Sequence, residues 1–133
     1  EEAEILAAVE EAGKEWREGF ERYDFAAALR AIWNLLSFLN RWIDTKAPWS
    51  LAKAGEDKEL DRVLYCLAEG QRIAATMLWP VMPSASRAIR ERLGDEVTDG
   101  APAAQELVWG RLREGAKVEK GEPLFPRVEK KPQ

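Results

Sequence analysis

Residues 25–46 read FAAALRAIWNLLSFLNRWIDTK, the clearest helical pattern in the chain. Apolar side chains recur in this stretch at steps of four and three residues, which places them on one face of an α-helix. These side chains are Phe25, Leu29, Ile32, Leu36, Leu39 and Ile43. A helix cannot cover such a face by itself, so the pattern predicts a bundle in which other helices pack against it.

Signals at both ends bound this helix. Asp24 precedes it and is well suited to accept a hydrogen bond from the free backbone N–H groups of the first turn. Pro48 ends it, because the residue before a proline is pushed out of the α region. The same proline can open a short helical turn over residues 49–54, which Gly55 closes.

Two further long segments have helical periodicity. The first has its apolar face on Ile5, Val9, Ala12, Trp16 and Phe20. The second covers residues 57–78 and has its buried side on Leu60, Leu64, Leu67, Ala74, Leu78 and Val81. Gly70 within it costs up to about 1 kcal/mol relative to alanine, which indicates close packing of helices at that point.

A shorter helix and a tail complete the chain. Ser84 is expected to cap a helix over residues 85–93, and residues 95–108 are expected to form a loop with one helical turn. Apolar groups at Trp109-Gly110 and at residues 123–126 (Pro-Leu-Phe-Pro) indicate that the tail is pinned to the bundle.

The expected fold is therefore an all-α, antiparallel helical bundle with an irregular C-terminal tail. We expect the bundle to cover residues 1–94. The chain starts on Glu1 rather than on Met, which suggests a piece of something longer. The tail that packs on the bundle is expected over residues 95–127, and a linker over 128–133.

The composition excludes the most common catalytic and metal-binding sites. A length of 133 residues is typical of a single domain, and an apolar content of 46% is sufficient for a hydrophobic core. The chain has no histidine, which excludes Ser-His-Asp catalysis and imidazole metal sites. Its one cysteine, Cys66, excludes an internal disulfide and paired-cysteine zinc motifs. Neither of the common glycine-rich phosphate loops is present.

The remaining candidates for chemistry are better interpreted as structure. Clustered acids at 10–11 and 57–61 lie on polar faces of the expected helices and are typical of solvated surface. Glu69 and Arg72 are three residues apart and can form either a surface pair or a buried bridge. Cys66 lies beside an apolar face, so we expect a small buried hydrophobic residue. No catalytic residue and no metal ligand is predicted.

The charge and the hydropathy of the chain limit the kinds of partner that it can bind. The net charge is −4, which argues against indiscriminate binding of nucleic acid, DNA included. The acidic N-terminus does not resemble a targeting signal, and no apolar run approaches the roughly 18 residues that cross a bilayer. A cytoplasmic location without a membrane partner is expected.

A polar stripe runs along the 25–46 helix, opposite its apolar face. It consists of Arg30, Asn34, Ser37, Arg41 and Asp44, with Asn40 at its border. The stripe leads to Trp49, which follows the break at Pro48. An indole on a rigid corner can stack on an unpaired base, while amides and charges contact its edge or its phosphate. The pattern thus suits a single-stranded nucleic acid.

Two plainer interpretations remain open at this point. Any solvated helix face is polar, and a tryptophan after a helix-ending proline often fills the gap between two helices. The tryptophans on or beside apolar faces are assigned to the core or to contacts between domains; they are Trp16, Trp33, Trp42 and Trp79. A helical module that binds protein rather than RNA would use the same surfaces.

The sequence also resembles a known family over its whole length. The motif A-L-x-x-I-W-x-L at residues 28–35, followed by N-x-W-I-D-x-x-x-P-W-x-L-A-K at 40–53, is similar to the anticodon-binding domain of bacterial methionyl-tRNA synthetases. Residues 69–72 (Glu-Gly-Gln-Arg), 78–83 and 121–128 fit later parts of the same domain. The N-x-x-I-D-x-x-x-P-W run favours the methionine branch over other class I synthetases, which remain an alternative.

This resemblance implies site residues. The family's indole that stacks on the first anticodon base falls on Trp49, and the acid that shapes anticodon selectivity falls on Asp44. Asn40 and Arg41 match motif positions and either contact RNA or brace the helix. Trp42 stands where the family often has tyrosine. An Asn and an Arg from a helix before Glu1 are also implied. The resemblance therefore implies that the bundle is incomplete at its N-terminal side and that part of the pocket lies outside this chain.

The resemblance further implies a division of labour. The parent methionine–tRNA ligase would use ATP and Mg²⁺ to attach methionine to tRNA, through histidine-containing and lysine-rich motifs that this sequence lacks. The chain is expected to hold no cofactor and to be inactive alone. Its expected partners are the anticodon loop of tRNA and the catalytic domain of the parent enzyme.

Overall fold

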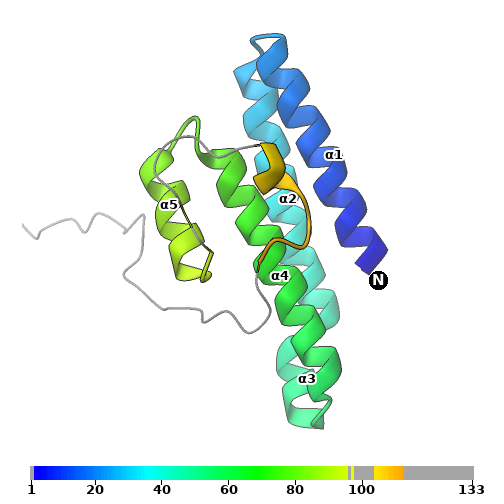
Figure 1. Cartoon of the computed structure of the whole chain (residues 1–133). Coiled ribbons are helices and arrows are strands. Elements are labelled where there is room, and N and C mark those ends of the chain that lie inside the picture. Colours follow the sequence, from blue (N-terminus) through cyan, green and yellow to red (C-terminus); the bar gives the residue numbers. More distant parts are fainter. Residues whose placement is uncertain (1, 96, 98–103, 113–133) are drawn as a thin grey trace, which may run out of the picture.

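The structure is a computed structural model that describes residues 2–95, 97 and 104–112 (Figure 1). Five α-helices and one short 3₁₀-helix make up this part of the chain, which contains no strand. They are α1 (Glu2–Glu21), α2 (Phe25–Lys46), α3 (Pro48–Ala54), α4 (Asp57–Leu78), α5 (Pro83–Arg92) and η1 (Ala104–Leu107). The expected all-α class is confirmed.

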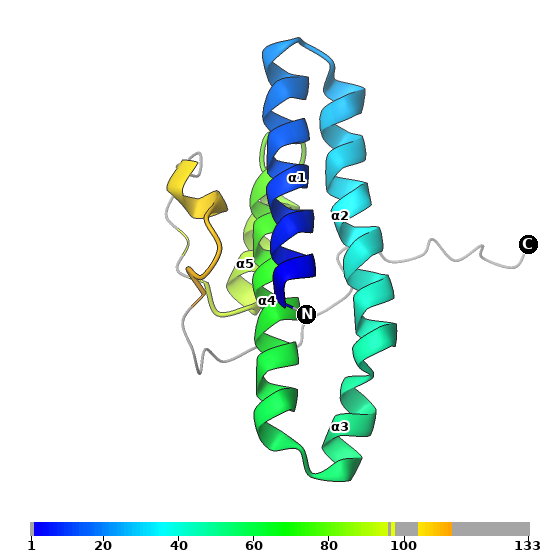
Figure 2. The same cartoon turned by 90° about the vertical axis from the view of Figure 1, so that its right-hand side faces the viewer.

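Successive long helices run in opposite directions. Figure 2 shows α1 and α2 as an antiparallel pair, with α3 at the far end of α2 and α4 returning beside it. The α4 helix is the centre of the bundle, because it contacts α1, α2, α3, α5 and η1. This arrangement leaves the α2–α3 corner at one end of the molecule.

The expected helix boundaries are largely confirmed. A carboxylate oxygen of Asp24 accepts a hydrogen bond from the backbone N–H of Ala27 at 3.0 Å. Gly55 closes α3 with a positive φ of 73°. The expected cap at Ser84 is wrong: α5 begins at Pro83 after Met82, because proline is well suited to the first helical position.

The core lies where α1, α2 and α4 meet. Its buried apolar side chains include Ile5, Val9, Ala31, Ile32, Leu35, Leu39, Trp42, Val63, Cys66, Ile73 and Met77. The indole N–H of Trp16 donates to the carbonyl oxygen of Met77 at 2.9 Å, which ties α1 to the end of α4. Close packing at Gly70 is confirmed, since a Cβ atom placed there would lie 2.7 Å from a methyl carbon of Leu39.

Three residues expected on buried faces are exposed. Phe25 is 54% exposed, Leu64 48% and Val81 47%. The buried face of α2 is centred instead on small and branched residues such as Ala28, Ala31 and Leu35. The predicted and the buried faces of α2 overlap at Ile32 and Leu39, but the buried face is turned towards Ala28, Ala31 and Leu35.

A buried ion pair fixes the last described segment to α4. Glu69 and Arg72 are fully buried and bonded to each other, so the buried-bridge alternative is the one observed. Arg72 also donates to the carbonyl oxygens of Glu106, at 2.6 Å, and Val108, at 3.0 Å. Glu69 accepts the backbone N–H groups of Gly110, at 2.6 Å, and Leu112, at 3.1 Å. We call residues 106–112 the strap.

Further bonds hold the two ends of the strap. The Tyr65 hydroxyl donates to the carbonyl oxygen of Leu112 at 2.7 Å. Arg90 on α5 pairs with Asp95 and with the Glu106 carboxylate, each at 2.7 Å. These bonds join the strap to α4 and α5. The rest of the expected tail, to residue 127, and the linker at 128–133 lie outside the described residues.

Candidate nucleic-acid interface

The predicted polar stripe of α2 is an exposed surface. Its five side chains are exposed to solvent: Arg30, Asn34, Ser37, Arg41 and Asp44. Asn40, at the border of the stripe, is exposed as well. The stripe extends over most of the helix because α1 and α4 pack on the other side of α2. Amides, a hydroxyl, cations and an acid are thus presented together along one helix.

A sharp corner follows the stripe. Ala47 joins α2 to α3 in the left-handed region, with φ 46° and ψ 65°. Its carbonyl oxygen accepts the backbone N–H of Ser50 at 2.9 Å, and Pro48 is buried. The corner is therefore braced from both sides, and α3 leaves it in a fixed direction.

Trp49 lies on the first turn of α3 and is 53% exposed. A tryptophan that filled the gap between two helices would be buried, so this exposure removes the packing interpretation for Trp49. The indole projects from a short helix whose start is fixed by Pro48 and whose end is fixed by Gly55. Such an exposed, positioned indole is suited to stacking on a planar partner.

The other predicted site residues lie on the last turns of α2, before this corner. Asn40, Arg41 and Asp44 are exposed, and the spacing of four residues puts Asn40 and Asp44 on one face. The backbone carbonyl of Arg41 accepts the Thr45 hydroxyl at 3.0 Å, while its side chain faces solvent. The end of α2 and the start of α3 thus bring all four predicted residues to the same end of the molecule (Figure 1).

The remaining tryptophans differ from one another. Trp42 is 5% exposed, and the ammonium of Lys46 lies 5.6 Å from its ring centroid. Trp16 and Trp109 are partly buried against the core, in agreement with the expectation. Trp33 is 55% exposed, so a place in the core is wrong for it, and a contact with another part of a longer protein remains the expectation.

The sequence pattern did not reveal that Trp33 lies on the same exposed face of α2 as two of the predicted site residues. Residues 33, 37, 40 and 44 follow one another at steps of four, three and four, so Trp33 shares a helix face with Asn40 and Asp44. That spacing was readable, but an indole at the border of an apolar face is assigned to the core by default.

An apolar groove lies next to this face. It has a volume of about 280 Å³ and is bounded by Trp33, Leu36 and Asn40 of α2, by Gln71, Ala74 and Leu78 of α4, and by Ile89 of α5. Most of its lining is apolar, with Asn40 and Gln71 as its polar members. We call it the α2–α4–α5 groove.

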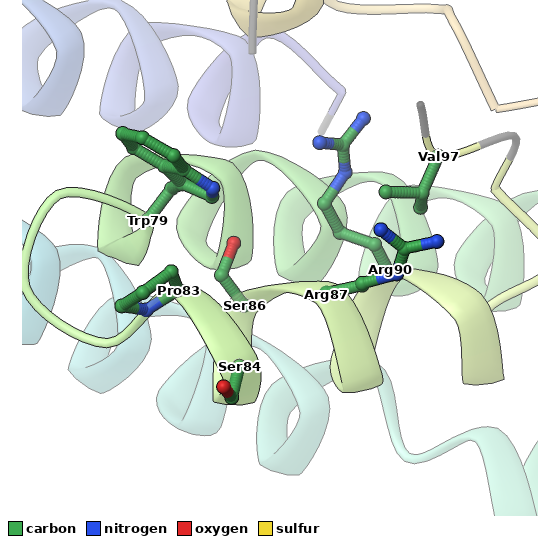
Figure 3. A pocket seen from close by; sticks show the side chains of 7 residues that line it. All are labelled: Trp79, Pro83, Ser84, Ser86, Arg87, Arg90 and Val97. Atoms are coloured by element: carbon green, nitrogen blue, oxygen red, sulfur yellow. The ribbon is translucent and has the colours of Figure 1, made fainter. Parts of the chain in front are cut away.

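A second pocket lies beside Trp79, at the junction of α4 and α5 (Figure 3). Its volume is about 190 Å³, and Figure 3 shows the indole at one end and Arg90 with Val97 at the other. Arg90 is engaged by two carboxylates, which keep the pKa of its guanidinium raised against the opposing effect of burial. This pocket is braced by the strap and offers no free buried charge for a ligand among the residues described.

A third, polar pocket of about 210 Å³ lies between the start of α1, the end of α2 and α4. Cys66 contributes to it, and burial together with a contact to the Glu2 carboxylate raises the pKa of its thiol to about 11. The thiol is therefore protonated and unreactive at neutral pH. The expected role of Cys66 as a small buried residue is confirmed.

No catalytic or metal-binding arrangement appears in the described part of the chain. Glu10, Glu11, Asp57 and Asp61 are exposed, as expected for solvated acids. Across residues 2–95, 97 and 104–112, no three acidic, cysteine or histidine side chains are placed to hold a metal ion. None of the helices within those ranges is long and apolar enough to cross a membrane.

Comparison with known proteins identifies a consistent set of relatives. The sequence model of a family described as the anticodon binding domain of methionyl tRNA ligase matches residues 1–133. The methionine–tRNA ligase of Bacillus subtilis is 39% identical over 128 residues, which are 94% of this chain and 19% of that protein. For the Streptomyces coelicolor ligase the identity is 40% over 119 residues, or 84% of this chain and 22% of that protein.

A solved structure shares the fold. The crystal structure of the apo form of Mycobacterium tuberculosis methionyl-tRNA synthetase matches with a TM-score of 0.85 and 27% identity, over 98% of this chain and 26% of that one. The chain spans about a fifth to a quarter of the length of these relatives.

Proposed function

Because the chain belongs to the family of anticodon-binding domains of methionyl-tRNA ligase, we propose that it selects tRNA through the anticodon loop. The observation that carries this proposal is the exposed indole of Trp49 on a braced helical corner, next to the polar end of α2. An unpaired anticodon base leaves the stack of its own loop and gains a replacement stack on this indole.

The polar end of α2 supplies discrimination. A carboxylate such as Asp44 only accepts hydrogen bonds, so it favours a base edge that carries an amino donor, as cytosine does at N4. The amide of Asn40 both donates and accepts, and the guanidinium of Arg41 suits a phosphate or a base acceptor. We assign Trp49 to stacking, Asp44 to selection of the base, and Asn40 and Arg41 to supporting contacts with RNA.

The chemistry of aminoacylation belongs to another part of the parent protein. We propose that the parent attaches methionine to tRNA with ATP and Mg²⁺ in the cytoplasm, and that its catalytic domain is the second partner of this chain. The 133-residue chain alone is expected to show no aminoacylation.

Binding to an anticodon stem-loop RNA tests the proposal. Trp49→Ala should weaken binding of a stem-loop with the methionine anticodon CAU by about 1–3 kcal/mol, or roughly 5- to 150-fold in Kd, because a base loses its stacking partner. Circular dichroism should show unchanged helix content, since half of this side chain is already in solvent.

Phe25→Ala is the matched control. Phe25 is exposed to a similar degree, 54%, but lies at the other end of α2, about 28 Å along the helix axis from Asp44. It should leave RNA binding unchanged. Normal RNA binding by the Trp49 variant, or an equal loss in both variants, would refute the proposed role of Trp49.

A further inference from the structure

The α2 helix differs from the rest of this acidic chain in its charge. The chain has 24 acidic and 20 basic residues, yet residues 25–43 contain two arginines, Arg30 and Arg41, and no aspartate or glutamate. The first acid after the cap at Asp24 is Asp44, near the other end of the helix. A polyanion can therefore approach most of α2 without meeting a carboxylate of the same helix.

Both arginines are available to a partner. Their side chains are exposed, and within residues 2–95, 97 and 104–112 neither forms an ion pair or donates a side-chain hydrogen bond. Arg41 follows Arg30 by eleven residues, or about three turns and 16–17 Å, so the two lie on one face. Asn34 and Ser37 lie between them on that face and are also exposed. The polar stripe thus offers hydrogen-bond donors along most of the helix.

The polar stripe leads directly to the proposed anticodon site. Asp44 is its last member, and Trp49 lies just beyond it, on the first turn of α3. An anticodon loop is closed by a paired stem, so an RNA whose loop lies at this corner also has to place its stem. Paired RNA is bound mainly through phosphates and 2′-hydroxyls, which guanidinium, amide and hydroxyl groups contact without reading the bases. The side chains of the stripe from Arg30 to Arg41 are of these three kinds.

The neighbouring α1 helix is unsuited to carry such a stem. Figure 2 shows α1 beside α2, and residues 1–24 contain nine acids and three bases. A hydrogen bond with Glu11, burial and the negative charges of Glu11 and Glu18 raise the pKa of the Glu15 carboxyl, so carboxyl groups crowd one another on this helix. Carboxylates repel an RNA backbone, which leaves α2 as the favourable side of the pair.

We propose that the stem of the bound RNA lies along the polar stripe, with the guanidinium of Arg30 on a stem phosphate. Arg41 and Asp44 lie nearer the loop, so Arg30 fixes the direction in which the stem leaves the α2–α3 corner. Its contact carries no information about the anticodon sequence, because phosphates are the same for every base. The inference rests on the proposed function and deepens it by assigning a surface to the stem.

Two RNAs separate the stem contact from anticodon recognition. One is a stem-loop with the anticodon CAU, and the other is the single-stranded loop sequence alone, which has no paired stem. Arg30→Ala should weaken binding of the stem-loop roughly threefold to tenfold at low salt and make the slope of log K against log salt shallower by about 0.7–0.9, because one phosphate contact is lost. Binding of the single-stranded loop should stay unchanged. Trp49→Ala, in contrast, should weaken binding of both RNAs.

Arg17→Ala is the matched control. It removes the same charge from an exposed position on α1, away from the stripe, so it should not weaken binding of the stem-loop. Circular dichroism should show the same helix content in both variants, since both side chains are in solvent. An equal loss in the two variants would overturn the proposal, because net charge rather than a contact at Arg30 would then be responsible.

The comparison of the two RNAs supplies the other decisive outcomes. Normal binding of the stem-loop by the Arg30 variant would overturn the proposal, since the stem would then lie elsewhere. So would an equal loss with both RNAs, because Arg30 would then contact the loop. An error in the proposed function gives a different result: the parent chain would bind neither RNA.

Discussion

Gly19 shows how a single missing side chain allows α1 and α2 to meet. A Cβ atom at this position would lie 2.8 Å from the backbone nitrogen of Ala28 and 3.0 Å from the carbonyl oxygen of Asp24. These are main-chain atoms, which cannot move aside as the end of a side chain can. The tight turn between the two helices therefore requires glycine for its lack of volume.

Gly19→Ala should lower the free energy of unfolding by about 1–3 kcal/mol, because overpacking forces the helices apart. Chemical denaturation followed by circular dichroism measures the change. Gly13→Ala, on the same helix, is the control: a Cβ atom there meets nothing within 4 Å, and the better helix propensity should stabilise the protein by up to about 1 kcal/mol. Stabilisation by both substitutions would contradict the close approach at Gly19.

Single residues also show how far exposure can be predicted from the sequence. Trp49 follows a helix-ending proline, and its side chain is exposed. Trp33 and Trp42 occupy similar apolar borders in the sequence, yet one is exposed and the other is 5% exposed. Neighbouring helices make this difference, and they are not visible in a local pattern.

At the scale of elements, the helices themselves could be predicted closely. Asp24, Pro48 and Gly55 act through local backbone chemistry, so they mark boundaries without knowledge of the fold. Trp109-Gly110 predicts that the tail packs on the bundle, but the partners of the strap could not be predicted, because Glu69 and Arg72 are more than thirty residues away and bind its backbone rather than any motif. Long-range recognition of main-chain groups leaves little trace in sequence.

Arg72→Met tests how the strap is held. The substitution leaves the Glu69 carboxylate buried without its cation and two strap carbonyls without a donor, so we expect a loss of about 3–5 kcal/mol in the free energy of unfolding. Denaturant titration gives the magnitude. Hydrogen exchange at the amides of Gly110 and Leu112 should accelerate at the same time.

Arg87→Ala on α5 is the corresponding control. Arg87 pairs with Glu91, but the two side chains are 45% and 52% exposed, so solvent screens the interaction and the expected cost is below about 1 kcal/mol. Should Arg72→Met cost no more than Arg87→Ala, the buried pair would not be what secures the strap.

At the scale of the whole molecule, the charge balance predicts weak dependence of RNA binding on salt. The net charge is −4, and the exposed basic side chains of the polar stripe and of α3 are Arg30, Arg41 and Lys53. Neutralising three phosphates gives a slope of log K against log salt of about −2 for a single-stranded loop. Binding of the stem-loop measured from low to physiological salt checks this value.

A much steeper slope would require many phosphate contacts, and the interface would then lie on a different surface from the α2–α3 corner. Substitution of all three basic side chains by alanine should flatten the slope towards zero. The preference for the first anticodon base should remain. Loss of that preference would mean that the basic side chains, rather than Trp49 and Asp44, read the anticodon.

The strap has one more consequence, for protein engineering. Arg72 and Glu69 bind carbonyl and N–H groups at alternate positions of the strap, and every residue except proline carries both groups. Gly110, with its φ of 95°, is the exception that must be kept. The exposed positions Val108 and Arg111 can therefore host foreign side chains, which makes the strap a grafting site for epitopes, labels or affinity handles on a helical scaffold.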